Sequence, residues 1–523
     1  MNREYATEII KKLLFWGVEE FYVCAGARDF PLIEAVCSIE SDHKIVFNHF
    51  EERSAAFYAL GRIKSLKKPI AIITTSGTAV GELLPATMES YYSGLPLVLL
   101  TADRPKSYRN TGAPQSAEHK NIFGIYVSKS FDLEVNDTIH LDDIPKNRPV
   151  HINVCFPMPL QSGQLTTIKK IVASASQQSN KVTNTQNLEL FLEKNKKTFV
   201  IVSQIFKQDK STIIKFIQDL NCPVYIESIS NLRECSELNH LKIKCGNKIW
   251  ENSNKSGYEF DSVIKIGGTP THRFWRDLDE TQKHISVFSI SELPFSGMPD
   301  AQHLTIDYDN FVPNIPRKNS NSIQMKKFLE LDNISYSNMC DLFICYPEAE
   351  QSLYFYLSAL IQENSRVYLG NSLPIRYWDL AAKFENKNFY IDASRGLNGI
   401  DGQISSFLGF ADEQSPENWG IFGDLTTLYD LASLWVLQHR KNLNVNIVIV
   451  NNGGGRIFNQ VLKGDISTLC QNIHELNFEH FAKFWGLEYE KVTNIAQIKP
   501  YHKCRIIEIV PNAVQTEELQ NLL

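Results

Sequence analysis

The sequence predicts an α/β protein with three doubly wound parallel-sheet domains, and three observations support this prediction. Short runs rich in Val, Ile, Leu and Phe recur along the chain, separated by segments long enough for a helix. Most of these runs are apolar throughout rather than alternating, as expected for strands that are covered on both faces. Two polar stretches divide the runs into three sets. Strands that alternate with helices in this way form right-handed βαβ units in parallel sheets.

Each set of runs defines one predicted domain. The domain at 1–172 contains the runs FYVCAG, KIVFNHF, IAIITTSG, LVLLTADR and VHINVCFP. The domain at 187–315 contains TFVIVSQIF, PVYIESI, SVIKIGG, ISVFSI and HLTIDYD. The domain at 335–523 contains RVYLGNS, NFYIDAS, GIFGDLT, VNIVIVNN and RIIEIV. The stretch SASQQSNKVTNTQN (173–186) is a linker by composition, and IPRKNSNSIQMKK (315–327) is a weaker candidate. The first segment, MNREYATEIIKKLLFWGVEEF, predicts an amphipathic helix rather than a signal peptide.

Composition narrows the classes of function. The chain has 523 residues, of which 43% are hydrophobic and 21% charged, as in an ordinary globular protein. A net charge of −6 and a pI near 6.1 argue against a dedicated binder of nucleic acid or of anionic membranes. No apolar run reaches the roughly 18 residues that a membrane span needs. The ten cysteines show no CxxC pair and no zinc spacing, which predicts reduced thiols in a cytoplasmic protein.

Two consecutive strands of the third set end in oxygen-bearing side chains and glycines. One run ends at Gly423-Asp424, and the next ends at Asn451-Asn452 and continues as GGGRIF. Adjacent parallel strands would bring Asp424 and Asn452 together at one sheet edge, beside a backbone carbonyl of the glycine loop. Mg²⁺ favours such oxygen ligands and completes its octahedron with phosphates and water. The start of a helix predicted over 425–435 would favour an anion.

A surface turn and two kinds of nucleotide-binding loop fit this segment less well than a metal site does. A surface turn followed by an Asp-capped helix is the simplest of the three, and for Asn-Gly alone it would be preferred. The loop lacks the lysine of a phosphate-cradling P-loop, and no GxGxxG follows the first strand. The pairing of Gly-Asp and Asn-Asn on consecutive strand ends therefore favours a metal and diphosphate site.

Gly-Asp followed about 27 residues later by Asn-Asn resembles the diphosphate-binding signature of the thiamine diphosphate-dependent enzymes. The resemblance implies that Asp424, Asn452 and the Gly454 carbonyl hold Mg²⁺, with Mn²⁺ as an alternative ion. Ile400 takes the position of the apolar residue beneath the bent cofactor, and Leu425 replaces the usual third residue of Gly-Asp-Gly. The full set of positions implied to contact thiamine diphosphate is Glu52, Gly399, Ile400, Asp424, Leu425, Thr426, Asn452, Gly454, Arg456, Ile457 and Phe458.

Thiamine diphosphate also needs a carboxylate that shares a proton with its aminopyrimidine ring. The segment HFEERSAAFYALG opens a helix after a strand and offers Glu51 and Glu52, whose ordinary role would be to complement the helix dipole. The first domain closely resembles the amino-terminal domain of one family, the 2-succinyl-5-enolpyruvyl-6-hydroxy-3-cyclohexene-1-carboxylate (SEPHCHC) synthases of menaquinone biosynthesis. The resemblance lies in four successive segments, HFEERSAAFYALG, TSGTA, LLTADRP and GAPQ. There the catalytic Glu directly precedes an Arg, which selects Glu52.

The resemblance covers nearly the whole chain and implies an activity and an assembly. The three domains would be pyrimidine-binding, central and diphosphate-binding in chain order. The reaction joins a succinyl semialdehyde unit, formed by decarboxylation of 2-oxoglutarate, to isochorismate. The active sites of this superfamily lie between subunits, which implies a homodimer or homotetramer.

Both substrates carry several negative charges, so arginines that bind carboxylates bidentately are expected. The positions that match substrate-binding residues of the family are Arg28, Arg104, Gln115, His272, Arg273, Ser372, Arg376 and Arg395. Taken singly, an arginine after a strand usually forms a surface salt bridge, but several of them at positions that match one family favour a shared anion-binding pocket. The sequence departs from the family pattern in three places: in the first loop, where Arg28 is kept but Ala27 replaces a Ser and Asp29 adds a negative charge; at Pro114; and at His272, where a Lys is usual. All three places lie at expected substrate positions.

Two other functions stay open. One is that of another thiamine diphosphate-dependent 2-oxoacid decarboxylase or ligase, such as an acetolactate synthase-like enzyme, with a different acceptor. The other is that of a non-catalytic cofactor-binding or scaffold protein. The many arginines argue against a small neutral acceptor, and the joint retention of Glu52, Asp424 and Asn452 argues against a scaffold.

Overall fold

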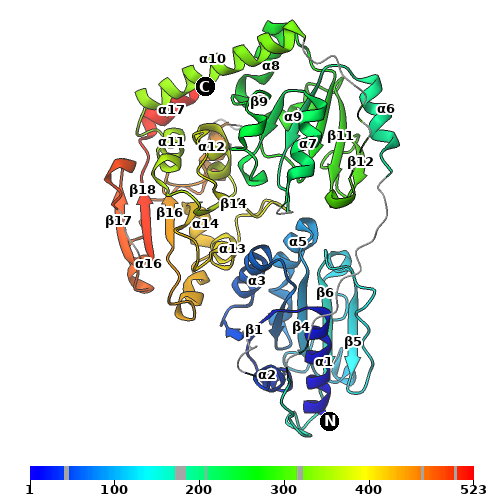
Figure 1. Cartoon of the computed structure of the whole chain (residues 1–523). Coiled ribbons are helices and arrows are strands. Elements are labelled where there is room, and N and C mark those ends of the chain that lie inside the picture. Colours follow the sequence, from blue (N-terminus) through cyan, green and yellow to red (C-terminus); the bar gives the residue numbers. More distant parts are fainter. Residues whose placement is uncertain are drawn as a thin grey trace. The chain divides into compact units, whose positions relative to one another are not determined.

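The computed structural model describes residues 1–40, 46–169, 171, 184–206, 209–311, 313, 315, 322–460, 464–499 and 503–523. Within these residues the strands form three six-stranded sheets, and every strand pair in them is parallel (Figure 1). Helices alternate with the strands along the chain. The predicted α/β class with three parallel sheets is confirmed.

The first sheet has the strand order β2-β1-β3-β4-β6-β5. Its strands are β1 (Glu20–Cys24), β2 (Val46–Asn48), β3 (Ile70–Thr74), β4 (Leu97–Asp103), β5 (Ser130–Glu134) and β6 (Val150–Cys155). Its helices are α1 (Asn2–Trp16), α2 (Phe30–Cys37), α3 (Glu52–Leu66), α4 (Thr78–Gly81) and α5 (Leu84–Ser93). The central strands β1, β3, β4 and β6 are buried along their whole length, which explains their apolar sequences.

The second sheet has the order β12-β11-β10-β7-β8-β9. Its strands are β7 (Thr198–Val202), β8 (Val224–Ile226), β9 (Lys242–Ile243), β10 (Ser262–Ile266), β11 (Ser286–Ser291) and β12 (Gln302–Thr305). Its helices are α6 (Gln186–Lys194), α7 (Ser211–Leu220), α8 (Ile249–Ser256) and α9 (Arg273–Glu280). The order of the strands reverses between β7 and β10, as in a doubly wound dinucleotide-type sheet.

The third sheet has the order β14-β13-β15-β16-β18-β17. Its strands are β13 (Arg366–Leu369), β14 (Tyr390–Asp392), β15 (Asn418–Gly423), β16 (Asn446–Val450), β17 (Glu488–Val492) and β18 (Arg505–Ile509). Its helices include α10 (Ile323–Cys345), α11 (Glu350–Leu360), α12 (Leu373–Ala381), α15 (Asp465–Gln471), α16 (Glu479–Phe484) and α17 (Ala513–Leu522).

The first and third sheets share one topology. When the strands are counted from one within each sheet, both have the order 2-1-3-4-6-5, whereas the second sheet differs. The connections reverse direction between β1 and β3 in the first sheet and between β13 and β15 in the third. Ligands of open parallel sheets bind at the carboxyl ends of strands beside such a reversal. The outer domains therefore each present one equivalent edge for a ligand.

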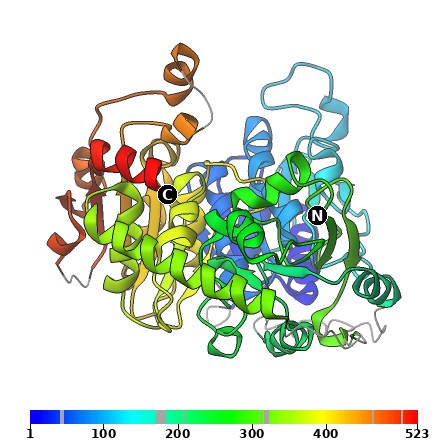
Figure 2. The same cartoon turned by 90° about the horizontal axis from the view of Figure 1, so that it is seen from above.

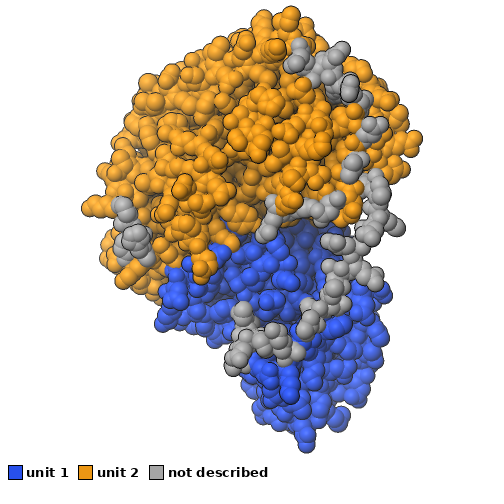
Figure 3. Space-filling model, viewed as in Figure 1, with its two compact units in different colours: residues 1–177, 396–413, 426–443 blue, residues 178–395, 414–425, 444–523 orange. Residues whose placement is uncertain are grey.

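By packing, the chain forms two compact units, drawn in blue and orange in Figure 3. Unit 1 contains residues 1–177, 396–413 and 426–443, and unit 2 contains 178–395, 414–425 and 444–523. Unit 1 thus holds the first sheet together with α13 (Gln403–Phe410) and the short 3-10 helix η8 (Ser433–Gln438). Unit 2 holds the second and third sheets.

Helix α10 connects the second and third domains within unit 2. Figures 1 and 2 both show it as one long helix. Met325 and Phe328 in its first half belong to the core of the second domain, whereas Met339 and Phe343 in its second half belong to the core of the third. The predicted boundary between 315 and 335 falls partly inside this helix, and residues 323–327 of the weaker linker candidate are helical. Most of the other linker, 173–183, lies outside the described residues.

Helices α3 and α13 cross closely within unit 1. A Cβ atom on Gly61 would lie 1.9 Å from the carbonyl oxygen of Ser406, and one on Gly409 would lie 2.2 Å from the carbonyl oxygen of Tyr58. The two backbones can approach this closely only because both positions lack a side chain.

The helix predicted over 425–435 is wrong in its length. Helix α14 covers only Asp424–Tyr429, and the chain resumes as η8 after a turn. The carboxylate of Asp430 is buried at this turn, where it accepts a hydrogen bond from the Ser405 backbone N–H at 2.9 Å. This tertiary contact fixes a turn that the apolar pattern alone does not reveal.

The apolar runs of the sequence do not include one strand of each sheet, namely β5, β9 and β17. All three are edge strands. β5 and β17 are partly exposed along most of their length, and β9 has only two residues. An edge strand is covered less completely than a central one, so it need not form an apolar run. Among the described residues, no helix is long and apolar enough to cross a membrane.

Candidate active site

The third sheet brings the Gly-Asp and Asn-Asn segments to one edge. β15 and β16 are neighbours, with Gly423 paired with Val450, so Asp424 and Asn451 leave adjacent strands at the same end. The buried Asp424 carboxylate accepts a hydrogen bond from the Gly454 backbone N–H at 2.8 Å and one from the Leu425 N–H at 2.7 Å. The two sequence motifs are therefore joined directly.

The glycine loop needs its glycines. Gly453 and Gly454 have φ values of 77° and 132°, and a Cβ on Gly454 would lie 2.5 Å from the carbonyl oxygen of Gln471. The carbonyl oxygen of Gly454 accepts a hydrogen bond from the Arg456 N–H at 2.9 Å and keeps a second lone pair. The Arg456 side chain donates to the Asn452 carbonyl at 3.0 Å and to the Gln471 side chain at 2.8 Å. Arg456 thus holds the shape of the loop.

The side-chain amide of Asn452 is hydrogen-bonded at its nitrogen but not at its oxygen. Its Nδ2 donates to Glu350 Oε2 at 2.9 Å, while its Oδ1 is buried and accepts no hydrogen bond from the described part of the chain. A buried polar atom without a partner costs about 1–3 kcal/mol. A hard cation would satisfy it, and Asp424 and the Gly454 carbonyl supply the other oxygens that Mg²⁺ prefers. The donor set fits the predicted ion.

This donor set has no cluster of acidic or imidazole ligands. Among the described residues, no group of three or more His, Cys, Asp or Glu side chains is placed to hold a metal ion. A cation at this edge would therefore depend on the single carboxylate of Asp424, on amide and backbone oxygens and on the phosphates of a ligand.

His474 is a neighbour of Asp424 that the sequence does not indicate. Its Nε2 lies 3.3 Å from Asp424 Oδ2, and its Nδ1 accepts a hydrogen bond from the Leu476 N–H at 3.2 Å. An accepting Nδ1 requires that the proton of the neutral ring is on Nε2, where it faces the carboxylate. Burial raises the pKa of Asp424, while the hydrogen bonds from Gly454 and Leu425 and the His474 ring oppose this effect.

Two buried glutamates hold the two asparagines, and neither was predicted from the sequence. Glu350, at the start of α11, binds Asn452, and burial raises the pKa of Glu350 to about 7. Glu508, in β18, accepts hydrogen bonds from Asn451 Nδ2 at 2.9 Å and from the Phe478 N–H at 2.8 Å. A charged residue inside the apolar run RIIEIV was a usable signal for Glu508. Nothing comparable marks Glu350.

The first domain separates the roles of its two adjacent glutamates. The carboxylate of Glu51 caps α3, accepting from the N–H groups of Arg53 at 3.1 Å and Ser54 at 3.0 Å. Glu52 is half-buried and accepts no side-chain hydrogen bond from another described residue. Burial raises the pKa of Glu52, and the negative charges of Glu51 and Glu82 add to this effect. A raised pKa suits a group that exchanges a proton near neutral pH.

Arg28 and Arg104 follow the carboxyl ends of β1 and β4 in the first sheet. Arg28 donates to the Phe156 carbonyl at 3.2 Å, and Arg104 donates to the Pro114 carbonyl at 3.0 Å. Burial, and next the charge of Arg104, lower the pKa of Arg28. The two guanidinium groups are thus close enough to influence each other. Gln115 lies beside Gly77, where a Cβ would be 3.3 Å from its Cα atom.

Asp29, one of the departures from the family pattern, lies inside the fold. It is fully buried, accepts a hydrogen bond from the Gly26 N–H at 3.0 Å, and burial raises its pKa to about 7. The added negative charge at this position is therefore reduced near neutral pH, and the carboxyl group supports the loop that carries Arg28.

A second group of cations lies in unit 2. Arg376, in α12, donates to the Ser372 carbonyl at 2.5 Å, and the buried Arg395 donates to Asn371 Oδ1 at 2.8 Å. Burial lowers the pKa of Arg376 to about 10, and the positive charges of Arg395 and Arg276 contribute. Arg276, a residue of α9, was not among the predicted residues. Arg395 and Arg276 are therefore close enough to Arg376 to influence its charge.

His272 and Arg273 have partners of their own. His272 Nε2 lies 3.0 Å from Asn247 Oδ1, and burial lowers the pKa of His272 to about 4, with a smaller effect of Arg376. The ring is therefore neutral near pH 7. Arg273 donates to Asp277 at 3.0 Å and to Glu280 at 2.8 Å on its own helix. Of these two residues, His272 is the one close enough to Arg376 for the positive charge of Arg376 to lower its pKa.

The remaining predicted cofactor contacts fall in both units. Gly399, Ile400 and Thr426 belong to unit 1, whereas Leu425, Ile457 and Phe458 belong to unit 2. The loop before Gly399 is fixed by the buried Glu89, which accepts hydrogen bonds from the Gly396 N–H at 2.8 Å and the Leu397 N–H at 2.7 Å. Ile457 packs on the core of the third domain, and Phe458 is 39% exposed.

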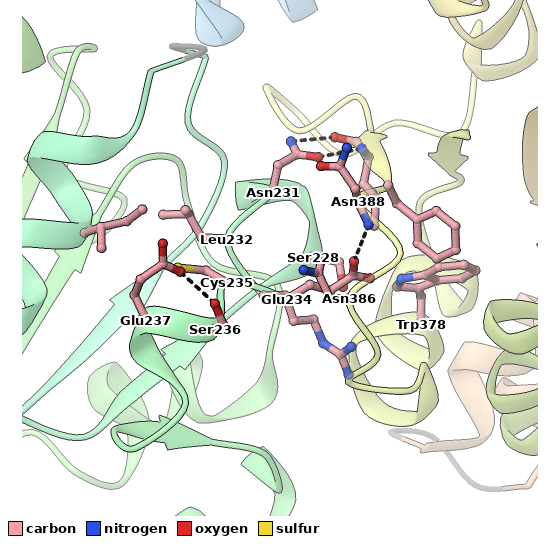
Figure 4. A pocket seen from close by; sticks show the side chains of 14 residues that line it. Ser228, Asn231, Leu232, Glu234, Cys235, Ser236, Glu237, Trp378, Asn386 and Asn388 are labelled. Carbon is pink, nitrogen blue, oxygen red and sulfur yellow. Dashed lines mark hydrogen bonds between the residues drawn. The ribbon is translucent and has the colours of Figure 1, made fainter. Parts of the chain in front are cut away.

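A cavity of about 270 Å³ lies elsewhere in unit 2, between segments of the second and third domains (Figure 4). Two of its charged lining residues are already paired. Glu234 accepts from the Lys387 and Asn388 N–H groups at 2.9 and 3.0 Å, and Arg233 donates to the Ala382 carbonyl at 2.6 Å. None of the predicted site residues lines this cavity. The residues that line it come from both the second and the third domain and hold these domains together.

Known proteins resemble this chain in sequence. The family model for the N-terminal thiamine pyrophosphate (TPP) binding domain of thiamine pyrophosphate enzymes matches residues 3–122. A SEPHCHC synthase of Bdellovibrio bacteriovorus is 38% identical, over 99% of this chain and 98% of its own length. The chain belongs to the SEPHCHC synthase family. The relative of that name in Akkermansia muciniphila is 30% identical over 99% of this chain and 97% of its own length.

Membership in the SEPHCHC synthase family confirms the resemblance seen in the sequence. A more distant SEPHCHC synthase, from Lysinibacillus sphaericus, is 27% identical over 95% of this chain and 91% of its own length. The protein is accordingly an enzyme of the thiamine diphosphate superfamily that forms carbon–carbon bonds, as expected for a transferase. The matched segment 3–122 contains Arg28, Glu52, Arg104 and Gln115.

Proposed function

We propose that the protein decarboxylates 2-oxoglutarate and adds the resulting four-carbon unit to isochorismate, which is the SEPHCHC synthase reaction of menaquinone biosynthesis. The relatives of that name align along almost the whole chain, so the proposal concerns a complete catalytic unit rather than one shared domain. The structural observation that supports its cofactor site is Asn452 Oδ1, which is buried and has no hydrogen-bond partner among the described residues, on the loop that is hydrogen-bonded to Asp424.

The proposed metal is Mg²⁺, with Mn²⁺ as a substitute. Asp424 would supply the anionic oxygen, Asn452 the amide oxygen and Gly454 the backbone carbonyl. The protein thereby offers few ligands and leaves the remaining positions to a diphosphate and water, which is how Mg²⁺ is commonly bound. Thiamine diphosphate, when bound, supplies the electron sink that decarboxylation of a 2-oxoacid requires.

Glu52 is the proposed proton-exchanging group. It would hold a proton against the aminopyrimidine ring and return it during turnover. Partial burial and the nearby Glu51 and Glu82 favour its protonated form, which supports this role because a general acid–base needs a pKa near the working pH. Glu51 cannot replace it without uncapping α3.

The proposed anion sites are the two groups of arginines. Arg28 and Arg104, with Gln115, would bind one acid, and Ser372, Arg376 and Arg395 would bind the other. His272, Arg273 and the additional Arg276 are candidates for the central domain. Guanidinium groups suit this task because they bind carboxylates bidentately. A small neutral acceptor would not require such a concentration of positive charge.

We further propose that the enzyme is a homodimer or a dimer of dimers. In the superfamily that the sequence resembles, the carboxylate and the metal site that serve one cofactor come from different subunits. Here Glu52 and Asp424 lie in different compact units, which is compatible with such sharing. A catalytically competent monomer, identified by sedimentation velocity at assay concentrations, would contradict this arrangement.

The main alternative is another thiamine diphosphate-dependent decarboxylase or ligase with a different acceptor. One assay separates the two. The protein is incubated with 2-oxoglutarate, isochorismate, thiamine diphosphate and Mg²⁺, and isochorismate loss and CO₂ release are followed together. We expect equal amounts of both. Turnover with pyruvate, but none with isochorismate, would favour the alternative, and no turnover with either would contradict both.

A further inference from the structure

We propose that Glu350 is a positioning residue for the metal site, because it fixes the Asn452 side chain with its oxygen toward the cation. This inference deepens the proposed function and rests on its metal site. Glu350 does not itself act as a ligand in this arrangement. It acts through the hydrogen bond that Asn452 Nδ2 donates to Glu350 Oε2 at 2.9 Å.

The chemistry of the two groups determines the direction of the amide. An asparagine amide has a donating end and an accepting end. In this structure the donating end, Nδ2, faces Glu350 Oε2 at 2.9 Å, and Oδ1 points away from it. This Oδ1 is buried and has no hydrogen-bonding partner in the described part of the chain. If the amide rotated by half a turn, its two N–H groups would face the cation and repel it.

The backbone around Glu350 is held firmly enough to set this direction. Glu350 is 2% exposed and is the first residue of α11. Its N–H donates to Thr516 Oγ1 at 3.0 Å, and the Glu348 N–H donates to Gln515 Oε1 at 3.0 Å. The start of α11 is thus anchored to α17, and the carboxylate lies at a defined place beside the glycine loop.

Comparison with the neighbouring asparagine shows why Glu350 serves the metal. Asn451 is held in the same way, with its Nδ2 donating to Glu508 at 2.9 Å. The Oδ1 of Asn451, however, accepts a hydrogen bond from the Gly453 N–H at 3.3 Å. Both ends of Asn451 are used to shape the loop, whereas Asn452 is held at one end only. The free end is the one suited to a ligand.

Metal affinity tests the inference directly. Binding of Mn²⁺ is measured by the loss of the free-ion electron paramagnetic resonance signal, with the full-length protein and saturating thiamine diphosphate. Glu350→Met keeps the length of the side chain and removes the acceptor, so it should weaken Mn²⁺ binding about 10–100-fold, as for other partners of metal ligands. Glu350→Gln keeps an accepting oxygen and should lose less.

Gln351→Met is the matched control. Gln351 is the next residue of α11 and is equally buried, but its amide donates to the Thr516 carbonyl at 3.3 Å and to Gln520 at 3.2 Å instead of contacting Asn452. It should retain the Mn²⁺ affinity of the wild type. Equal losses in both variants would mean that any disturbance of α11 weakens the site, and would overturn the specific role of Glu350.

A double-mutant cycle with Asn452→Ala completes the test. If Glu350 acts through Asn452, Glu350→Met should cause no further loss of Mn²⁺ affinity once Asn452 is Ala. A further loss of the same size, or unchanged affinity of the single Glu350→Met variant, would overturn the inference. If Glu350→Met does not fold, Glu350→Asp, which draws the acceptor back, is compared in its place. Wild-type protein that binds no Mn²⁺ would instead refute the metal site itself.

Discussion

Glu51 and Glu52 are consecutive residues whose carboxylates have different surroundings. Glu51 accepts hydrogen bonds from the N–H groups of Arg53 and Ser54 and so caps α3. Glu52, the first residue of that helix, is half-buried, and burial raises its pKa. One carboxylate is therefore committed to the fold, and the other remains available for proton exchange. This contrast supports the choice of Glu52 on grounds independent of sequence resemblance.

We expect Glu52→Gln to fold and bind thiamine diphosphate but to lose about 10²–10⁴-fold in kcat, the usual contribution of a general acid–base group. Cofactor binding is measured by calorimetry and turnover by isochorismate consumption. Glu51→Ala is the control: it should cost about 0.5–2 kcal/mol of stability through loss of the cap and leave a folded, active enzyme at low temperature. Full activity of Glu52→Gln would exclude it as the proton-exchanging group.

Asp424→Ala should weaken Mg²⁺-dependent binding of thiamine diphosphate by at least about tenfold, or about 1.4 kcal/mol. The variant loses both the anionic oxygen and the acceptor of the Gly454 N–H. Asp424→Asn keeps that acceptor and removes only the charge, so it should fall between the wild type and Asp424→Ala. Titration of the cofactor at several Mg²⁺ concentrations measures this. A Mg²⁺ dependence that is identical in all three proteins would argue against Asp424 as a ligand.

Arg376 and Arg273 should respond differently to substitution. Arg376 has its pKa lowered by burial and by nearby cations, a situation that binding of a carboxylate would relieve. We expect Arg376→Gln to raise the KM of one of the two acids by about tenfold, or about 1.4 kcal/mol. Arg273 is 58% exposed and already paired with Asp277 and Glu280, so Arg273→Gln should have a smaller effect. The reverse order would make Arg273 the substrate contact.

The sequence predicted the central strands well but missed one edge strand of each sheet. Central strands of parallel sheets are covered on both faces, so their residues are mostly apolar, as in β4 and β16. The strands β5, β9 and β17 are at sheet edges and carry polar residues or are very short. The identical strand order of the outer sheets was not predictable either, because pairing between distant strands leaves no local pattern.

For the site, the sequence indicated the residues that follow strand ends. It missed the residues that hold those side chains in place. Asp424 and Asn452 could be found because strand ends at one sheet edge converge. Glu350 comes from a helix 74 residues before Asp424, and His474 from a loop 22 residues after Asn452, so only tertiary packing brings them to the motif. Likewise, the pairing of Arg273 within α9 depends on the orientation of the helix.

Gly61→Ala should destabilise unit 1 by about 1–3 kcal/mol, the usual cost of an overpacked contact. The new Cβ would meet the Ser406 carbonyl where α3 crosses α13, and backbone atoms cannot yield as a flexible side chain can. Gly81→Ala is a control with open space around the added atom, and it should leave stability unchanged or raise it slightly. Chemical unfolding measures both. A neutral effect of Gly61→Ala would show that the two helices separate easily.

His151 should contribute a loss of stability when the pH is lowered below about 6.5. This residue is fully buried in β6, hydrogen-bonded through its two ring nitrogens to Thr101 and Ser130, and burial lowers its pKa to about 3. Between about pH 3 and pH 6.5 the folded protein keeps the ring neutral, whereas the unfolded chain takes up a proton. The unfolded state binds more protons in this window, so acid favours unfolding.

His151→Gln offers hydrogen-bonding groups without a titrating ring. It should reduce the slope of the free energy of unfolding against pH, by up to about 1.4 kcal/mol for each pH unit in that window. Urea unfolding of both proteins near neutral pH and near about pH 5 measures the slope. Other buried groups also contribute to the slope, in both directions: burial lowers the pKa of His49 to about 4 and raises that of Asp29 to about 7. The comparison of the two proteins isolates the part that belongs to residue 151. Equal slopes in the two proteins would mean that His151 is protonated in the folded state or that another group controls acid unfolding.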